Sequence, residues 1–389
     1  MSNTLYLILL AKSMRIFTFS LISILIPVYL IGLGCSPFYV TLGIFFIVLG
    51  NVTFNLLLAL YKNSIGRRNF LIISSLFMMI SGIILLLSRS FILILIALFM
   101  GNISVTGTET GPFQSVEVGI IPKLAKNPGR VLGVYNLLGY SFSSLGSFSI
   151  PLLSHFITSD TIIMAKLVFI LYIIMSMLLI LVYRKIMNIE VGHNGMSKNL
   201  PGLLLHQDVR NLSVLFALDA FGGSLITQSL LTLWFYLRFH ASASSLGIVF
   251  GISSIITAIS LIIAPLIAER IGNLHTMVFT HITSNIFLIL IPFMNSLYWA
   301  VVFLFLRQSF SQMDVPTRQA FISQIFNDEE RVKVFAVTNI FRNISSLPGP
   351  VLVGFILSLR LLYLPLVMSG AIKLSYDVTI YKLYKNKAR

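Results

Sequence analysis

Charged residues are scarce in this sequence. Lysine, arginine, aspartate and glutamate together supply 10% of its 389 residues, whereas a soluble domain carries roughly 25%. Hydrophobic residues supply 57% of the chain. This balance excludes an ordinary soluble globular protein. It equally excludes intrinsic disorder, which requires low hydrophobicity and high net charge.

Cysteine and acidic residues are scarce as well. A single cysteine, Cys35, excludes an internal disulfide framework and a cysteine-rich metal site. Only 12 acidic residues accompany 27 lysines and arginines, which gives a formal net charge of +15. Because cytoplasmic loops of membrane proteins collect lysine and arginine, we interpret this charge as the mark of a lipid bilayer partner and not of nucleic acid.

Long apolar runs are abundant. A membrane-spanning helix needs about 20 apolar residues, and the chain contains twelve such stretches joined by mostly short connections. We therefore predict an all-α integral membrane protein with twelve transmembrane helices and no sizeable soluble domain. The predicted spans are 7–31, 38–60, 70–88, 91–111, 131–154, 162–183, 211–237, 244–268, 276–295, 298–315, 333–357 and 362–383.

Lysine and arginine are unevenly divided between the two sides of these spans. If both termini lie inside, the outer connections hold only Arg89, Arg238 and Arg360, with Lys166 near an outer helix start. The positive-inside rule then predicts cytoplasmic termini in a multi-pass protein of the plasma membrane. The inner side carries Lys62, Arg67, Arg68, Lys123, Lys126, Arg130, Arg184, Lys185, Lys198, Arg210, Arg270, Arg318, Arg331, Lys333, Lys382, Lys385, Lys387 and Arg389.

The two halves of the chain repeat each other. The register that places Arg15 on Asp219 also places Ser20 on Ser224. Many transporters consist of such duplicated halves. The longest connection follows the sixth predicted span and is rich in glycine, asparagine and charge. We predict a six-helix bundle at 1–183, a cytoplasmic linker at 184–210 and a second, pseudo-symmetric six-helix bundle at 211–389.

The connection between the second and third spans carries a motif. It reads Ala59-Leu-Tyr-Lys-Asn-Ser-Ile-Gly-Arg-Arg68, and the second half has Pro265-Leu-Ile-Ala-Glu-Arg-Ile-Gly-Asn273. Both resemble Gly-x-x-x-Asp-Arg-x-Gly-Arg-Arg, the signature of the major facilitator superfamily. The first copy has Asn63 and Ser64 in place of Asp-Arg. The resemblance covers the whole chain and implies a secondary transporter whose two bundles alternate access to a central cavity.

Arg15 and Asp219 lie about nine residues into the first and seventh spans, and ionisable side chains inside a membrane usually face a cavity or a charged partner. The resemblance implies that these two spans face each other across the central cavity. We therefore hypothesise that Arg15 and Asp219 pair across it and that Asp219 binds and releases a proton. The alternative is a structural ion pair inside one bundle.

Two further arginines lie within spans. Arg307 is near the middle of the tenth span, and Arg342 is in the eleventh among polar residues. Arginine stays charged when buried and binds carboxylates and phosphates through two parallel hydrogen bonds. Together with Arg15 and Asp219, these arginines form the predicted set for substrate binding and ion coupling, and their positive charge favours an anionic solute.

Charges at the inner helix ends form a second candidate set. Similar charges in the resembled family latch the cytoplasmic side when the protein opens outward. We expect Glu109 to bind Arg67 or Arg130, and Asp314 to bind Arg270, Arg318 or Arg331. Ordinary solvation of helix ends is the alternative. The predicted gate comprises Arg67, Glu109, Arg130, Glu269, Arg270, Asp314, Arg318 and Arg331.

Three other features complete the pattern. Lys373 and Asp377 are four residues apart in the last span, which suits an intrahelical ion pair. His155 and His281 have no partners at metal-ligand or catalytic spacing, so we interpret both as structural. The prolines at 348–350 should break the eleventh span near its middle.

Three classes of function compete. The sequence has no Walker, HExxH or GxSxG motif, so we expect neither an ATP-driven pump nor an enzyme, and no cofactor or metal. We predict a monomeric, proton-coupled secondary transporter of a small anionic solute. The alternatives are proton-coupled export of amphipathic or drug-like compounds, and a membrane sensor or channel without turnover.

Overall fold

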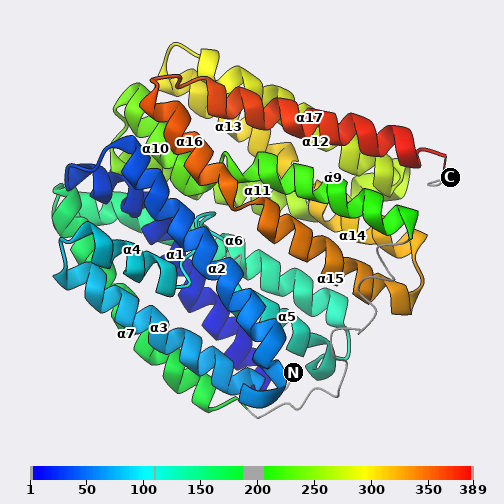
Figure 1. The fold of residues 1–389 in the computed structure, drawn as a ribbon, viewed down its shortest axis with the longest axis horizontal. Helices are drawn as coiled ribbons and strands as arrows, with labels where there is room; N and C mark the ends of the chain where they lie inside the picture. The colour runs from blue at the N-terminus through cyan, green and yellow to red at the C-terminus, as the bar shows by residue number, and fades with distance from the viewer. Residues whose placement is uncertain (1–2, 109–110, 187–205, 387–389) are drawn as a thin grey trace. The chain divides into compact units, whose positions relative to one another are not determined.

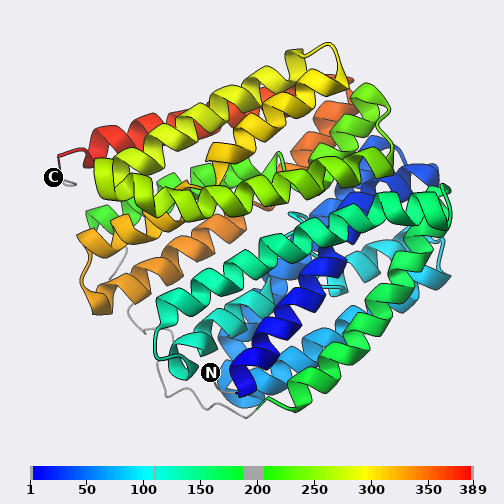
Figure 2. The same cartoon turned by 180° about the vertical axis from the view of Figure 1, so that it is seen from behind.

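The computed structural model describes residues 3–108, 111–186 and 206–386, and these residues form helices joined by turns, without strands (Figures 1 and 2). The α-helices are α1 (Asn3–Gly32), α2 (Pro37–Ile65), α3 (Arg67–Leu87), α4 (Phe91–Met100), α5 (Pro112–Leu124), α6 (Pro128–Phe156), α7 (Thr161–Arg184), α9 (Gln207–Ser224), α10 (Gln228–Phe239), α11 (Ala243–Ile271), α12 (Asn273–Leu290), α13 (Leu297–Ser311), α14 (Asp314–Ile325), α15 (Asp328–Ser345), α16 (Pro348–Ser358) and α17 (Leu364–Tyr384).

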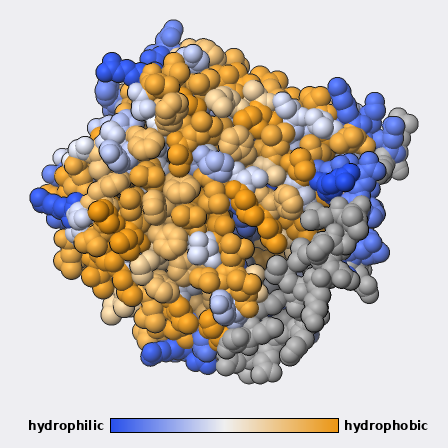
Figure 3. Space-filling model, in the orientation of Figure 1, coloured by the Kyte–Doolittle hydropathy of each residue, from blue (hydrophilic) through white to orange (hydrophobic). Residues whose placement is uncertain are grey.

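Within the part of the chain that the structure describes, eight stretches of helix are long and apolar enough to cross a membrane. Each coincides with a predicted span. α6 and α17 are also long enough, at 29 and 21 residues, but they are more polar. Large apolar side chains point outward, as Leu87 does with 77% of its surface exposed. Figure 3 shows that hydrophobic residues cover most of the displayed face, which is the surface that a lipid environment requires.

Helix breaks correct three predicted spans. The fourth span is helical only to Met100. In 101–108 hydroxyl side chains, and not a continuing helix, bond to backbone carbonyls: Thr106 Oγ1 donates to the Thr108 carbonyl at 3.0 Å. A new helix, α5, then begins at Pro112, in a stretch assigned to a connection. The seventh span is divided between α9 and α10, and the tenth between α13 and α14. The break expected in the eleventh span is confirmed, since α15 ends at Ser345 and α16 begins at Pro348.

Packing divides the chain into two units. Unit 1 lies within Met1–Asn194 and Thr227–Ser254, and unit 2 within Gly195–Ile226 and Ile255–Arg389, so α11 contributes to both. The sequence-based bundles assign 227–254 to the second half. In the structure these residues pack with the first: Ser229 Oγ donates to the Ser23 carbonyl at 2.8 Å. Most of the predicted linker, 187–205, lies outside the described residues.

The internal repeat is visible inside each unit. In unit 1, α1 packs on α6 and α7, and α3 packs on α7. In unit 2, α9 packs on α15 and α17, and α12 packs on α17. Gly66 and Gly272, matched in the sequence, share one unusual backbone conformation, with φ of 76° and 86°. Positive φ favours glycine because it has no Cβ. The two sharp helix junctions therefore depend on the same residue type.

Serine and glycine make equivalent helix contacts in the two units. Ser20 Oγ donates to the Phe17 carbonyl at 3.0 Å, and Ser224 Oγ donates to the Phe221 carbonyl at 2.7 Å. A glycine of another helix lies against each serine hydroxyl. A Cβ on Gly146 would collide with Ser20 Oγ, and a Cβ on Gly349 would collide with Ser224 Oγ. These close approaches fix where α6 crosses α1 and where α16 crosses α9.

Candidate functional site

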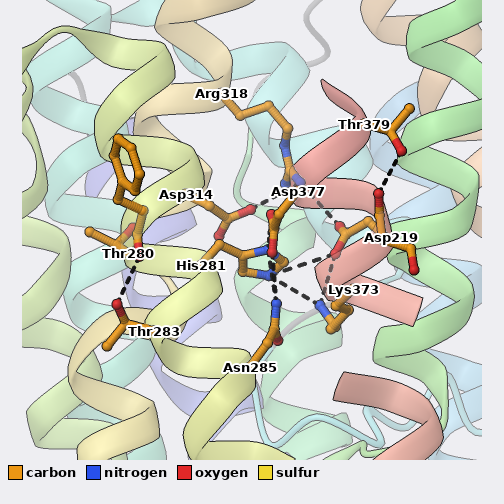
Figure 4. Close-up of polar contacts among 12 residues, drawn as sticks. Asp219, Thr280, His281, Thr283, Asn285, Asp314, Arg318, Lys373, Asp377 and Thr379 are labelled. Atoms are coloured by element: carbon orange, nitrogen blue, oxygen red, sulfur yellow. Dashed lines mark hydrogen bonds and ion pairs between the residues drawn. The ribbon is translucent and has the colours of Figure 1, made fainter. Parts of the chain in front are cut away.

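A cluster of ionisable and amide side chains lies inside unit 2 (Figure 4). Five helices supply it, and most of its members are almost completely buried. Charged groups inside a membrane protein are costly and usually mark function or close pairing. We call it the Asp219 cluster; it comprises Asp219 of α9, His281 and Asn285 of α12, Asp314 and Arg318 of α14, Arg342 of α15, and Lys373 and Asp377 of α17.

Asp219 has several cationic partners. Its Oδ1 accepts a hydrogen bond from Lys373 Nζ at 2.8 Å. Its Oδ2 is shared by Arg342 Nη1 at 3.1 Å and Arg318 Nη1 at 3.3 Å. These distances exceed those of the shortest charge-assisted bonds, as expected when two guanidinium groups compete for one oxygen. Asp219 is therefore a shared acceptor and not half of an exclusive pair.

His281 connects two carboxylates of the cluster. Its Nδ1 lies 2.7 Å from Asp377 Oδ1, and its Nε2 lies 3.7 Å from Asp219 Oδ1. Asn285 Nδ2 donates to the other oxygen of Asp377 at 3.0 Å. Lys373 Nζ is also 3.3 Å from His281 Nε2 (Figure 4). The imidazole ring thus lies between an ammonium and a carboxylate on one side and a second carboxylate on the other.

Arg318 joins the predicted gate to the predicted coupling site. It binds Asp314 Oδ2 at 3.1 Å within α14, which confirms an arginine partner for Asp314, and it also binds Asp219. Three carboxylates of the cluster thus meet three permanent cations. The cluster is charge-balanced when His281 is neutral. Arg342, with 26% of its side chain exposed, is its most accessible member.

Lys373 and Asp377 do not behave as the intrahelical pair that their spacing predicts. Lys373 reaches Asp219 on α9, and Asp377 reaches His281 on α12. Both side chains lie on the buried face of α17, which packs against those two helices. Tertiary partners therefore replace the local one. Sequence spacing could identify the face but not what lies opposite it.

Unit 1 contains a different charged centre. Arg15 forms two parallel bonds with Glu117 of α5, at 2.9 and 2.6 Å, and both side chains are fully buried. Tyr183 accepts from Arg15 and donates to Glu117 at 2.8 Å, and Tyr135 donates to Glu117 at 2.8 Å. The Phe113 ring lies 4.7 Å from the guanidinium carbon of Arg15. This is a closed pair, saturated on the carboxylate side.

The sequence-based pairing of Arg15 with Asp219 is thereby replaced. The structure gives Arg15 a carboxylate partner in unit 1 and gives Asp219 cationic partners in unit 2. For Arg15 this is the alternative arrangement, an ion pair inside one bundle. Sequence reasoning missed Glu117, because 112–130 was treated as a connection. The repeat could not have located it either, because the register that places Arg15 on Asp219 places Glu117 on Phe321 and not on Arg318.

Arg307 is the buried cation of α13. Only 9% of its surface is exposed, its Nη1 donates to the neutral Gln308 side chain at 2.8 Å, and its Nε has no hydrogen-bond partner within the described residues. Gln308 Oε1 is itself shared with Ser311 Oγ at 2.9 Å. A buried donor without a partner is costly. Arg307 therefore keeps unused capacity to bind an acceptor.

Apart from Asp314 and Arg318, the predicted gate residues are not brought into contact with one another by any ion pair among the described residues. Arg67 Nη1 donates to the Gly119 carbonyl at 3.0 Å. Glu109 lies outside the described residues, so its expected partner stays a prediction. Arg130, Glu269 and Arg270 are exposed, and Arg331 is partly buried. Within the described residues, no group of three histidine, cysteine or acidic side chains is placed to hold a metal ion.

Comparison with known proteins identifies the fold. Residues 8–350 match the family model of the Major Facilitator Superfamily. An uncharacterized membrane protein of Saccharomyces cerevisiae (strain ATCC 204508 / S288c), YJR124C, is 25% identical over 411 residues, covering 94% of this chain and 91% of the yeast protein. Its name describes no activity.

Solved transporter structures share this architecture. The nucleoside transporter NupG superimposes with a TM-score of 0.76 at 10% identity, over 99% of this chain and 100% of that one. A D-xylose-proton symporter gives 0.73 at 14%, over 97% and 95%. The human organic anion transporter MFSD10 (TETRAN) gives 0.66 at 15%, over 97% and 99%. Their cargoes differ chemically, so the common fold does not select a substrate.

Proposed function

The chain belongs to the Major Facilitator Superfamily, and on that premise we propose that it carries a small anionic solute across the membrane together with a proton. The family consists of secondary transporters, so the protein is a multi-pass membrane transporter rather than an enzyme. The transported solute is held between the two bundles of such proteins and released by alternating access.

The surroundings of Arg307 are the observation that supports a preference for anionic solutes. Four other cations have carboxylate partners: Arg15 binds Glu117, and Lys373, Arg318 and Arg342 share Asp219. The buried Lys12 lies over the Tyr135 ring, with its Nζ 4.2 Å from the ring centroid. Arg307 contacts a neutral amide and has an unused Nε donor. A carboxylate or phosphate would satisfy this donor with a charge-assisted bond. Arg342, the partly exposed cation, is the second proposed contact.

Proton coupling is proposed for the Asp219 cluster. A coupled carrier needs an acidic or basic group whose partners change during the cycle. Asp219 shares its two oxygens among three cations, so losing one partner leaves others in place. The sequence also suggested Arg15 for ion coupling, but its closed pair with Glu117 supports a structural role for that residue.

Topology and gating extend the proposal. We place both termini in the cytoplasm, at the plasma membrane, because lysine and arginine dominate that side of the spans. A monomer suffices, since each unit contains its own charged centre. The Asp314–Arg318 pair would contribute to closing the cytoplasmic side, together with Arg67, Glu109, Arg130, Glu269, Arg270 and Arg331.

Uptake into proteoliposomes tests the anionic preference. A panel of radiolabelled carboxylates, phosphate esters and neutral amphipathic compounds is offered under an imposed pH gradient. Arg307→Gln should reduce uptake of the anionic solute at least about tenfold, because a charged hydrogen bond contributes roughly 1.5–3 kcal/mol. Arg307→Lys should retain part of it. Arg89→Gln, which removes an exposed arginine, should leave uptake unchanged.

A neutral amphipathic compound carried equally well by wild type and Arg307→Gln would contradict the anionic proposal. That result would favour the alternative of proton-coupled export of drug-like compounds. Equilibration without accumulation would instead indicate a channel. The three functions therefore give three distinct results in the same vesicles.

A further inference from the structure

The protonation state of His281 follows from its neighbours. An ammonium group has three donors and no acceptor. Lys373 Nζ, at 3.3 Å from His281 Nε2, can therefore bond to that nitrogen only through its lone pair. The ring proton then lies on Nδ1, where it is donated to Asp377 at 2.7 Å. Asp377 also accepts from Asn285. In this arrangement His281 is neutral, and its contacts with Lys373 and Asp377 each pair a donor with an acceptor. Asn285 Nδ2, 3.4 Å from His281 Nδ1, then donates to Asp377 and not to the ring.

A second proton on His281 is incompatible with this arrangement. A proton on Nε2 would point toward the ammonium of Lys373, so two donors and two positive charges would face each other. The nearest acceptor for the new N–H is Asp219 Oδ1, 3.7 Å away, which Lys373 occupies. His281 can become an imidazolium only if Lys373 gives up that oxygen. The proton and Lys373 therefore compete for one site.

Charged groups from several helices face His281 directly or through a shared partner. On α17 it faces Lys373, Asp377 and the Tyr376 ring, whose centroid is 5.9 Å from that of the imidazole. α9 contributes Asp219. α14 and α15 contribute Asp314, Arg318 and Arg342, which reach the ring through Asp219 and its shared oxygens. Arg307 is the charged residue of α13, which also packs against α12. Without the second proton on His281, the cluster is neutral, because three carboxylates match three cations.

The side chain of Lys373 packs against α9 where that helix has no side-chain Cβ. It runs beside two consecutive glycines of α9. Its Cγ is 2.9 Å from where a Cβ of Gly222 would lie, and its Nζ is 3.7 Å from the same position at Gly223. Any larger residue at Gly222 would press on the lysine stem. Lys373 also has 11% of its side chain exposed, against 5% for Asp219.

We propose that His281 is the proton-binding group of the transporter, and that proton uptake exchanges Lys373 for His281 at Asp219 Oδ1. The exchange leaves Asp219 ionised and paired, and it frees the Lys373 ammonium. The added positive charge favours entry of an anion, and by linkage the anion favours the proton. This inference rests on the proposed anion and proton cotransport, which it deepens by naming the proton site and the residue it releases.

Histidine NMR tests the exchange without any knowledge of the solute. The full chain, labelled with ¹⁵N-histidine in nanodiscs, is titrated between about pH 8 and about pH 5. Its 6 histidines are distinguished with a His281→Gln variant. The wild-type His281 signal should start as the neutral form with its proton on Nδ1 and become an imidazolium on acidification.

Two variants separate exchange from simple titration. Lys373→Met removes the competing ammonium, so the imidazolium-to-neutral ratio of His281 should rise about tenfold at the same pH. Asp219→Asn removes the charged acceptor, so the ratio should fall. Lys382→Met, on the exposed face of the same helix, is the matched control and should change nothing.

A His281 signal that stays neutral throughout the titration in wild type overturns the inference, whether or not the variants fold. An unchanged ratio in a folded Lys373→Met protein also overturns it. If proton-driven uptake is observed while His281 stays neutral, cotransport stands and its proton site lies elsewhere. If His281 titrates as expected but a pH gradient drives no uptake, the cotransport proposal fails while the exchange stands.

Discussion

Each unit has an ion pair between its first helix and a short helix that follows a break in its fourth span, and the charges are reversed between the two units. In unit 1, Arg15 of α1 binds Glu117 of α5; in unit 2, Asp219 of α9 binds Arg318 of α14. The first pair is bidentate, at 2.9 and 2.6 Å. The second is a single contact at 3.3 Å to an oxygen that another arginine shares. One unit thus holds a closed pair and the other an open network.

This difference suggests that the ion pair of unit 1 stabilises the fold, whereas the network of unit 2 can exchange partners. Both oxygens of Glu117 accept hydrogen bonds from arginine and tyrosine donors. If either charged partner were lost, the other would remain buried without compensation for the water it has lost, which is costly. Asp219 can lose one of its cations and keep the others. A duplicated fold can therefore use one half as a rigid support and the other as the place where charges are redistributed.

The largest effect is expected from neutralising the open network. Asp219→Asn should abolish accumulation driven by a pH gradient, because the oxygen over which Lys373 and His281 compete loses its charge. Exchange of solute between equal pools on both sides should persist. Uphill and counterflow uptake in the same vesicles measure this. Retained uphill transport would assign proton coupling to another group. The open network of unit 2 would then have no special role in transport.

Neutralising the closed pair should cost stability instead. Glu117→Gln leaves Arg15 buried without a carboxylate, for which about 3–5 kcal/mol of destabilisation is expected. Unfolding in mixed micelles measures it, with the exposed Glu269→Gln as control, which should stay within about 0.5 kcal/mol. The double variant Arg15→Met with Glu117→Leu should recover much of the loss. A stable single variant would show that the pair is not an anchor.

The smallest effects should be equal in the two units. Gly146→Ala and Gly349→Ala each drive a Cβ into a serine of the neighbouring helix, and overpacking costs about 1–3 kcal/mol. Gly133→Ala, also in α6, meets no atom within 4 Å. It should be neutral or slightly stabilising, because alanine favours a helix. Unequal losses at 146 and 349 would mean that the repeat extends to topology but not to packing.

The sequence predicted the helices and many of the charged positions. Apolar length identified the spans, the prolines at 348–350 identified the break in the eleventh, and the repeat register aligned Ser20 with Ser224. Asp219 and Arg342 were selected because charges are rare inside spans, and Asp314 and Arg318 were selected as charges at inner helix ends. The structure brings these four together.

The partners of these charges could not be predicted in the same way. Glu117 lies in a helix that follows a glycine-rich break, so hydropathy placed it outside the membrane. His281 and Lys373 have no informative spacing with Asp219, because contacts between α9, α12 and α17 depend on how the helices cross. Local spacing instead suggested a Lys373–Asp377 pair. Sequence periodicity gives the buried face of a helix, but only tertiary packing gives the opposing residue.

The position of Lys373 in the last helix has a consequence for biosynthesis. It follows Asp219 by 154 residues, which a ribosome takes roughly 8–30 s to add. During that interval Asp219 enters the insertion machinery without the ammonium that later binds it. α17 carries Lys373 and Asp377 together, so it is itself a poor candidate for independent insertion. Arg318 and Arg342 are made earlier and can bind Asp219 first, so the charge balance of the Asp219 cluster is completed only after α17 has been synthesised.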